Sequence, residues 1–227
     1  MTESVIEARN IFAGYGNADV LRDLSLSVGP GCFAGLRGPN GAGKSTFLKL
    51  CLGMIPSRAG LITVLGEKPG SAAFRQILFR IGYVPQNTAG GSLPVTVREA
   101  AAMGRYGKAG FLRPLSRRDW ELVDAALEAA GIGELSGCRV QELSGGQCQR
   151  TAIARSLAME AELLLLDEPT ASLDAGGRAE LLRLIGRLRK ERRLTVVMAS
   201  HDTEALSECE IIYRFEGGKA SGELSCA

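Results

Sequence analysis

The segment that most restricts the fold is residues 38–45, which read GPNGAGKS. The apolar run at residues 32–36 before it is typical of a buried strand, and residues 44–52 after it carry apolar side chains at helical spacing. A strand, a glycine-rich loop and a helix in this order fit the P-loop pattern, in which backbone N–H groups surround phosphate oxygens. We therefore expect an α/β fold with a nucleotide site at this loop.

The glycine-rich loop predicts ATP and Mg²⁺ as the ligands of the chain. Lys44 is expected to reach the β- and γ-phosphates, and Ser45 is expected to bind Mg²⁺. An ordinary turn from strand to helix would not need a lysine among glycines. The residues expected to contact the nucleotide here are Gly38, Pro39, Asn40, Gly41, Ala42, Gly43, Lys44, Ser45 and Thr46.

Four leucines at residues 163–166 lead into Asp167 and Glu168, as in a buried strand that ends in carboxylates. We expect Asp167 to hold Mg²⁺, directly or through water. Glu168 is expected to accept a proton from the water that attacks the γ-phosphate. Acidic residues also end strands merely because the chain emerges into water, and it is the glycine-rich loop that favours the catalytic interpretation.

His201 is the only histidine, and it follows another apolar run at residues 194–199. The carboxyl ends of parallel strands share one edge of a sheet, so His201 is expected on the same edge as Asp167 and Glu168. There its imidazole could hydrogen-bond the γ-phosphate or the attacking water. A lone histidine is usually structural or solvated, and the shared edge favours the catalytic role.

A second anion site is predicted at Ser144, Gly145, Gly146 and Gln147, which precede an apolar-periodic segment at residues 147–159. Ser144 is a candidate N-cap, and the N–H groups beyond it favour an anion. The chain has no second nucleotide motif. The interpretation that needs one ligand only is a homodimer with ATP at the interface, in which each Ser144 loop covers the γ-phosphate held by the other copy.

The order of the predicted elements indicates a mainly parallel sheet with helices on both faces. Residues 24–28 alternate like a half-buried strand and predict a small antiparallel subdomain, while residues 178–189 predict a helix between two strands. Residues 87–140 are expected to be helical and to lack strands, most clearly at 97–103 and 120–130. The whole chain is expected to be one domain at 1–227, with a nucleotide-binding core at 1–86 and 156–227 and an inserted helical subdomain at 87–155.

Composition excludes several classes of protein. The 227 residues are 45% hydrophobic and 23% charged, close to ordinary globular usage. The net charge of +2 predicts no nucleic-acid partner. No apolar stretch reaches the roughly 18 residues that span a bilayer, and the first ten residues do not resemble a secretory signal. Six cysteines without a CxxC spacing are expected to be small apolar residues, with Cys226 the one expected at the surface, in a cytosolic chain.

Two local basic clusters remain. The run at residues 187–193 ends a predicted helix, where cations are favoured and solvated. The cluster from Arg105 to Arg118 is interpreted either as a solvated surface or as a place where a membrane partner docks.

These motifs together resemble the nucleotide-binding subunit of an ATP-binding cassette transporter over about residues 5–215. The string LSGGQ at residues 143–147 matches the family signature, and residues 167–170, 172–174 and 200–202 match its acidic strand end, interface loop and switch histidine. The resemblance implies that Tyr15 stacks on adenine. It also implies that Gln86 contacts Mg²⁺, takes part in catalysis and senses the membrane subunit.

Two positions depart from the commonest family pattern, Cys148 after the signature and Phe47 in the helix after the loop. Residues 94–107 are similar to the corresponding region of importers for manganese, zinc and related metals, and more distantly to importers of iron chelates and cobalamin. Neither departure falls on a predicted phosphate contact.

The resemblance implies an ATPase that powers import of a divalent metal ion. Its partners would be integral membrane permease subunits and, indirectly, an extracytoplasmic solute-binding protein, and its location would be peripheral, on the cytoplasmic face of the cell membrane. The alternatives are an ATPase for iron-chelate or cobalamin import, an exporter or lipoprotein-release ATPase, and a soluble ATPase of this family outside transport. A module that binds ATP without cleaving it is disfavoured by the presence of both Glu168 and His201.

Overall fold

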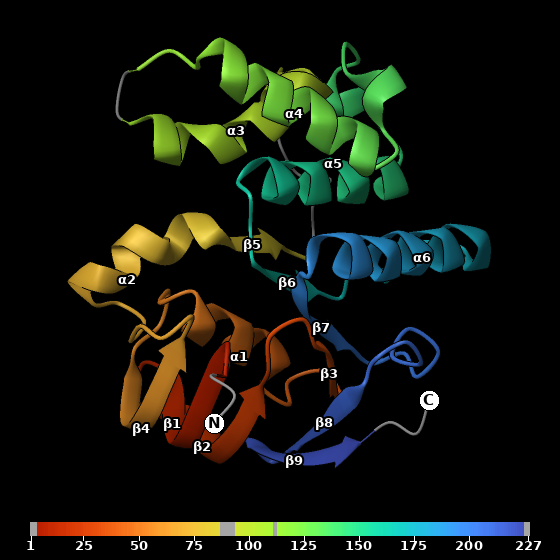
Figure 1. The fold of residues 1–227 in the computed structure, drawn as a ribbon. Helices are drawn as coiled ribbons and strands as arrows, with labels where there is room; N and C mark the ends of the chain where they lie inside the picture. Colours follow the sequence, from red (N-terminus) through yellow and green to blue (C-terminus); the bar gives the residue numbers. More distant parts are fainter. Residues whose placement is uncertain (1–3, 87–93, 111–112, 225–227) are drawn as a thin grey trace.

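The computed structural model describes residues 4–86, 94–110 and 113–224. Figure 1 shows two sheets in the lower part of the view and a layer of helices above them. A three-stranded antiparallel sheet has the order β2-β1-β4, where β1 is Ile6–Tyr15, β2 is Ala18–Val28 and β4 is Ser57–Val64. The predicted antiparallel subdomain is thus confirmed, and the strand expected at 24–28 is the end of β2.

The main sheet has six strands in the order β5-β6-β7-β3-β8-β9. The first five are parallel, and only β9 runs antiparallel to its neighbour. The three predicted strands are confirmed, and β5, β8 and β9 are additional. Their bounds are β3 Phe33–Arg37, β5 Ile81–Val84, β6 Leu163–Asp167, β7 Thr195–Ser200, β8 Ile211–Glu216 and β9 Lys219–Leu224.

The central strands β3, β6 and β7 of the main sheet are buried on both faces, which explains why they read as continuous apolar runs rather than alternating ones. In β6, Leu164 and Leu166 belong to the core that contains the helix α5 (Gly145–Ala158) and the helix α6 (Ala175–Arg192). Leu163 and Leu165 point the other way, into the core shared with the antiparallel sheet and the helix α1 (Lys44–Cys51). The predicted α/β architecture with helices covering the sheet is therefore confirmed.

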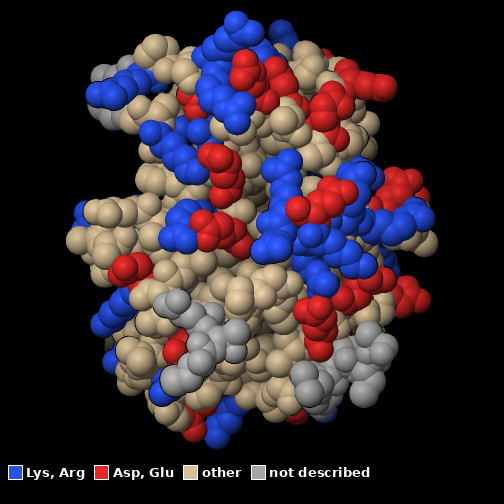
Figure 2. Space-filling view, viewed as in Figure 1, with Lys and Arg blue, Asp and Glu red and all other residues tan. Residues whose placement is uncertain are grey.

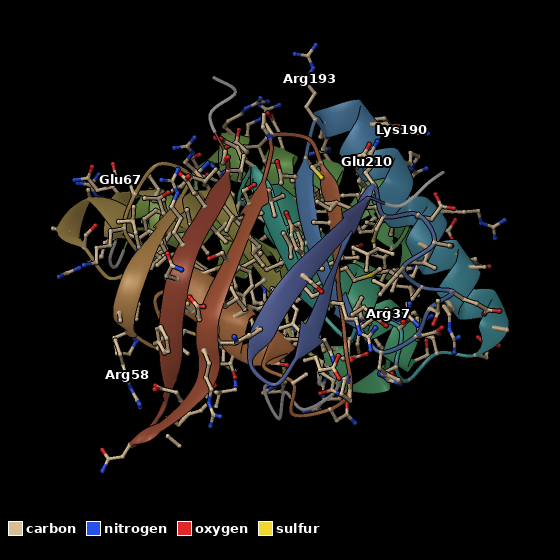
Figure 3. The ribbon with its side chains drawn as sticks, turned by 90° about the horizontal axis from the view of Figure 1, so that it is seen from below. Arg37, Arg58, Glu67, Lys190, Arg193 and Glu210 are labelled. Carbon is tan, nitrogen blue, oxygen red and sulfur yellow. The ribbon has the colours of Figure 1, made fainter. Side chains whose placement is uncertain are left out.

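The two sheets meet along one edge. The N–H of Arg22 in β2 donates to the carbonyl oxygen of Gly218 in the β8–β9 turn, at 2.8 Å. Figure 3, seen from below, shows β8 and β9 lying beside β1 and β2. A short helix α2 (Ala72–Ile77) and the 3₁₀ turn Leu78–Arg80 connect β4 to β5.

The helical layer consists of α3 (Val97–Ala109) and α4 (Arg117–Ala129), packed on α5. Both predicted helices are confirmed, and both begin earlier or end later than the sequence indicated. Capping boxes fix where both helices start. The side chains of Thr96 and Ser116 each accept a hydrogen bond from the third helical N–H, and the carboxylate of that third residue accepts one from the backbone N–H of the cap. Two 3₁₀ turns, Gly133–Leu135 and Val140–Glu142, lead to α5. The division at residue 155 falls within α5, and the subdomain boundaries stay a prediction.

The cysteines that the structure describes are free thiols, three of them buried. Burial raises the pKa of Cys209 to about 12, so this residue behaves as a small apolar side chain, as predicted. Cys226 lies outside the described residues. Among the helices that the structure describes, none has the length and apolar character needed to cross a membrane.

Candidate functional site

The glycine-rich loop joins β3 to α1 and encloses a cavity of about 370 Å³. Gly41 and Gly43 have φ values of 82° and 104°, which residues with a Cβ rarely adopt. At Gly43 a Cβ would also lie 2.7 Å from Leu21 Cδ2, so the Leu21 side chain would have to shift as well. The cavity is lined by Val20, Asn40, Gly41, Ala42, Gly43, Lys44, Ser45, Thr46, Gln86 and Glu168.

Lys44 is 5% exposed, although a lysine is rarely buried without a partner. Its Nζ donates to the carbonyl oxygens of Gly38 and Pro39 at 2.6 and 3.1 Å, and it lies 3.5 Å from Glu168 Oε1. Phosphate oxygens are better acceptors for an ammonium group than carbonyl oxygens are. The loop thus presents a cation and exposed N–H groups to one cavity, which fits a triphosphate.

A serine and a carboxylate meet beside the loop. Ser45 Oγ donates to Asp167 Oδ1 at 2.8 Å, and the Tyr83 hydroxyl donates to Asp167 Oδ2 at 3.4 Å. Burial raises the pKa of Asp167 above its ordinary value, and the hydrogen bond from Ser45 opposes this shift. Hydroxyl and carboxylate oxygens are hard ligands, and Gln86 adds an amide at the same cavity. The donor set fits Mg²⁺ bound together with phosphate.

The structure brings Glu168 and His201 together. His201 Nδ1 lies 2.9 Å from Glu168 Oε2, and the His201 N–H donates to the same oxygen at 3.4 Å. Glu168 has φ of 48°, a strained conformation for this residue type, and it lines the cavity. Its Oε1 is buried and lies 3.5 Å from Lys44 Nζ, and it accepts no hydrogen bond from the described residues. An acceptor of this kind is suited to a water molecule.

Ser144 caps α5, as predicted. Its Oγ accepts from the Gln147 N–H at 3.4 Å, and its own N–H donates to Gln147 Oε1 at 2.8 Å. This loop lines a second cavity of about 610 Å³, whose lining includes Gly145, Gly146 and Arg150. The other side of that cavity is the interface loop, residues 172–174. The two cavities share no described lining residue, so one chain holds two separate candidate anion sites.

Tyr15 and Gln86 were assigned through the family resemblance alone. Tyr15 ends β1, is 48% exposed and has Lys49 Nζ at 5.9 Å from its ring centre, but it is not among the residues that line the cavity. Gln86 does line the cavity. The departures from the family pattern are packing residues, since Phe47 and Cys148 are both buried and Phe47 meets the ring of Phe215 at 6.0 Å between centres.

Three residues of the site were missed from sequence. Val20 lines the cavity, Tyr83 hydrogen-bonds Asp167, and Arg178 forms an ion pair with Asp202 beside His201. For Tyr83 a signal existed, because it stands three residues before Gln86 at the end of an apolar run. Val20 and Arg178 reach the site only through tertiary packing, for which the sequence carried no sign.

The two basic clusters differ in their partners: most cations of the Arg105 to Arg118 cluster are ion-paired, whereas in the run at residues 187–193 the structure describes an ion pair for Arg189 alone. Figure 2 shows acidic residues interspersed among the basic ones over α6 and the helical layer. In Figure 3, Lys190, Arg193 and Glu210 lie near the end of α6, and Arg189 binds Glu210 at 2.8 Å. Arg105 is 7% exposed and bound to Asp119 and Glu160, so it contributes structure and not a docking surface.

Comparison with known proteins agrees with this geometry. Residues 21–171 match the family model described as ABC transporter. The manganese transport system ATP-binding protein MntB of Bacillus subtilis is 36% identical over 204 residues, covering 89% of this chain and 79% of the relative. The zinc import ATP-binding protein ZnuC of Cereibacter sphaeroides is 40% identical over 200 residues, covering 88% of this chain and 73% of the relative.

Solved structures show the same fold. The structure of cbiO1 from Clostridium perfringens, part of the ABC transporter complex cbiONQ, has a TM-score of 0.87 at 27% identity and covers 98% of this chain and 89% of its own. The dimeric structure of MJ0796, a bacterial ABC transporter cassette, has a TM-score of 0.83 at 25% identity, with coverage of 98% and 99%. A family match over more than half of its length, together with these relatives, shows that the chain belongs to the ABC transporter family as an ATP-binding, ATP-hydrolysing subunit.

Proposed function

We propose that this subunit uses ATP hydrolysis to drive import of a divalent metal ion, manganese or zinc. The observation that carries the proposal is the pair of relatives named for manganese transport and zinc import, each covering nearly nine-tenths of the chain. Residues 94–107, which resemble the corresponding region of metal importers, support it from the sequence side. Iron-chelate import and export remain the outcomes against which the proposal is tested.

In the proposed site, Lys44 and the N–H groups of the glycine-rich loop hold the triphosphate. Ser45, Asp167 and Gln86 would hold Mg²⁺, which, when bound, neutralises charge on the phosphate oxygens. Tyr15 would stack on the adenine from the end of β1. The hydrogen bond from Ser45 Oγ to Asp167 Oδ1 at 2.8 Å supports this assignment, because it holds two candidate oxygen ligands side by side.

Glu168 is assigned as the general base. Its buried Oε1 is available to accept the proton of the attacking water, while Oε2 is engaged by His201. His201 is 56% exposed in its side chain, so its Nε2 edge is open to the γ-phosphate or the water. The proton would move from the water to Glu168 as the water oxygen bonds the γ-phosphorus and the bond from that phosphorus to the β–γ bridging oxygen breaks, which releases ADP and phosphate.

The complete site is proposed to need two copies of the chain. The cavity at Ser144 and the cavity at Lys44 share no described lining residue, and each offers N–H groups at a helix start. A two-fold dimer would place the Ser144 loop of one copy over the γ-phosphate held by the other, forming two equivalent sites. The dimeric cassette of the same fold supports this arrangement. Loss of the γ-phosphate would then remove the contact that closes the dimer.

The proposed partners are integral membrane permease subunits, which an extracytoplasmic solute-binding protein supplies with the metal, and the subunit would sit on the cytoplasmic face of the membrane. The net charge of +2 does not favour a nucleic-acid partner, and on the face shown in Figure 2 basic residues are mixed with acidic ones. The structural neighbour that is part of a transporter complex supports a membrane assembly.

The deciding experiment is to purify the chain with its native membrane partner, reconstitute both in vesicles and measure ATP turnover. The solute-binding protein is added without solute, with Mn²⁺, with Zn²⁺, with a ferric chelate or with cobalamin. Stimulation by Mn²⁺ or Zn²⁺ alone supports the proposal. Stimulation only by a chelate or cobalamin, or turnover that no presented solute changes, contradicts it.

A further inference from the structure

Arg178 joins the start of α6 to the turn that follows β7. Its Nη1 forms an ion pair with Asp202 Oδ2 and lies 3.8 Å from Glu204 Oε2. The pair is partly buried, with 30% of the Arg178 side chain and 22% of the Asp202 side chain exposed. An ion pair shielded in this way is worth more than one at a fully solvated surface.

Asp202 in turn fixes the backbone around His201. Its Oδ1 accepts from the Glu204 N–H at 2.9 Å, and its own N–H donates to Ser200 Oγ at 3.0 Å. His201 lies in the chain between Ser200 and Asp202, which this last hydrogen bond joins. The imidazole that meets Glu168 at 2.9 Å therefore belongs to the residue directly before the Asp202 carboxylate.

The other end of Arg178 is tied to the interface loop, residues 172–174. Asp174 caps α6 by accepting from the Gly177 N–H at 2.9 Å, and the Arg178 N–H donates to the Asp174 carbonyl oxygen at 2.9 Å. Asp174 lines the cavity that contains the Ser144 loop. One arginine thus connects that cavity to the His201 and Glu168 pair.

We propose that Arg178 is a positioning residue for hydrolysis. It holds His201 toward Glu168 through Asp202, and it makes this alignment depend on the place of the interface loop. The inference rests on the roles proposed for Glu168 and His201, and it is independent of which solute is transported. When a second copy closes on the interface loop, the first turn of α6 would then shift Arg178 and with it the orientation of His201.

Stability alone does not account for this contact. The Arg178 Nε–H is buried and has no acceptor among the described residues, and an unmade buried bond costs stability. The ion pair of Arg80 and Glu162 offers a comparison, because it makes two hydrogen bonds of 2.7 and 2.6 Å. It lies at the amino ends of β5 and β6, away from the site at their carboxyl ends. If ion pairs served only to fasten elements, both pairs would be equivalent in their effect on turnover.

The test compares Arg178→Gln, Asp202→Asn, the double variant and Arg178→Lys with the matched control Arg80→Gln. ATP turnover of the full chain is measured alone and with its membrane partner, and thermal unfolding is measured for each. We expect Arg178→Gln to lower kcat roughly tenfold with KM for ATP changed less than about threefold, since misplaced catalytic groups slow chemistry more than binding. Arg178→Lys should recover part of the loss, and Arg80→Gln should keep the parental kcat.

The double variant decides whether the two residues act as one unit. If Arg178 works through Asp202, the double variant loses no more kcat than the worse single variant, whereas independent effects multiply. The proposal is overturned if Arg178→Gln turns over at the parental rate, if Arg80→Gln loses as much, or if the single losses multiply. Failure of the metal-import proposal leaves these outcomes unaffected, because they are read from ATP turnover without solute.

Discussion

His201 Nδ1 lies 2.9 Å from Glu168 Oε2, and the two residues follow neighbouring parallel strands, β7 and β6. The second oxygen of the same carboxylate lies 3.5 Å from Lys44 Nζ in the glycine-rich loop. One buried carboxylate therefore links three segments that are far apart in sequence. The arrangement supports the proposed role of Glu168 as proton acceptor, and that role can be tested without knowledge of the transported solute.

Glu168→Gln should lower ATP turnover by at least about 100-fold, because an amide cannot accept the proton of the attacking water. ATP affinity should stay near the parental value, since Lys44 and the loop N–H groups are untouched. Phosphate release and calorimetry measure the two effects. The variant should also accumulate as an ATP-bound dimer.

The matched control for Glu168→Gln is Glu162→Gln, at the amino end of the same strand and exposed to solvent. It removes one carboxylate from the chain without altering the cavity, so its turnover should be unchanged. Hydrolysis by Glu168→Gln at the parental rate would remove this residue from the role of general base.

Lys44→Ala should weaken ATP binding roughly 10- to 100-fold, because hydrogen bonds from a charged donor are worth about 1.5–3 kcal/mol. Isothermal calorimetry with Mg-ATP reads the change directly. Lys190→Ala, which removes an exposed cation from the last turn of α6, is the control for net charge. Equal affinities for Lys44→Ala and the parent would contradict the assignment of the phosphate site.

The buried strands and the glycine-rich loop could be predicted because their sequence patterns are local. Residues 163–167 and 194–199 are apolar on both sides, which only a strand buried on both faces requires, and GPNGAGKS carries its own chemistry. The strands β8 and β9 were missed because they have weaker patterns, with β8 exposing Arg214 and Glu216 at its outer positions. β5 was missed because four residues are too few for a periodic signal.

The roles of Val20 and Arg178 could not be predicted for a different reason. Val20 reaches the cavity because β2 of the antiparallel sheet packs over the glycine-rich loop, and Arg178 reaches Asp202 because α6 and β7 are brought together by the sheet order. Contacts of this kind follow from tertiary placement, and no spacing in the sequence encodes them. Tyr15 and Gln86 were accessible only through resemblance to a family.

Arg105 ties α3 to α4 and to the end of α5, and we expect its loss to destabilise the helical layer. Arg105→Gln leaves the largely buried Asp119 without its cation, and breaking a buried pair costs about 3 kcal/mol. Glu160 is half exposed and keeps Lys108 at 3.0 Å, so its share of this cost is small. Urea unfolding at neutral pH measures this difference. Arg118→Gln, which removes an exposed partner of Glu121, should change stability by less than about 0.5 kcal/mol.

The cost of Arg105→Gln should depend on pH. Hydrogen bonds from Arg105 and then Lys108 lower the pKa of Glu160, and those of Ser116 and then Arg105 lower the pKa of Asp119. A carboxylate with a lowered pKa in the folded state stabilises the fold above its unfolded pKa and loses this contribution as the pH falls through its folded pKa. The difference in free energy of unfolding between the parent and Arg105→Gln should therefore become smaller as the pH falls below the ordinary pKa values of 4.5 and 3.8. A gap that is constant with pH would show that packing and not charge holds the three helices.

Ser144→Glu should abolish ATP-dependent dimer formation while leaving ATP binding to the single chain intact. The proposed dimer places Ser144 against the γ-phosphate of the other copy, and two negative charges juxtaposed across an interface cost several kcal/mol. The variant is made in a Glu168→Gln background, so that the parent stays closed on Mg-ATP, and dimers are counted by light scattering. Ser116→Glu is the matched control, because Ser116 also caps a helix through a capping box but lies on α4. Both variants lose a cap worth about 1 kcal/mol, and only Ser144→Glu should stay monomeric. Dimers formed equally well by both variants would place the Ser144 loop away from the nucleotide and leave the second cavity without its proposed ligand.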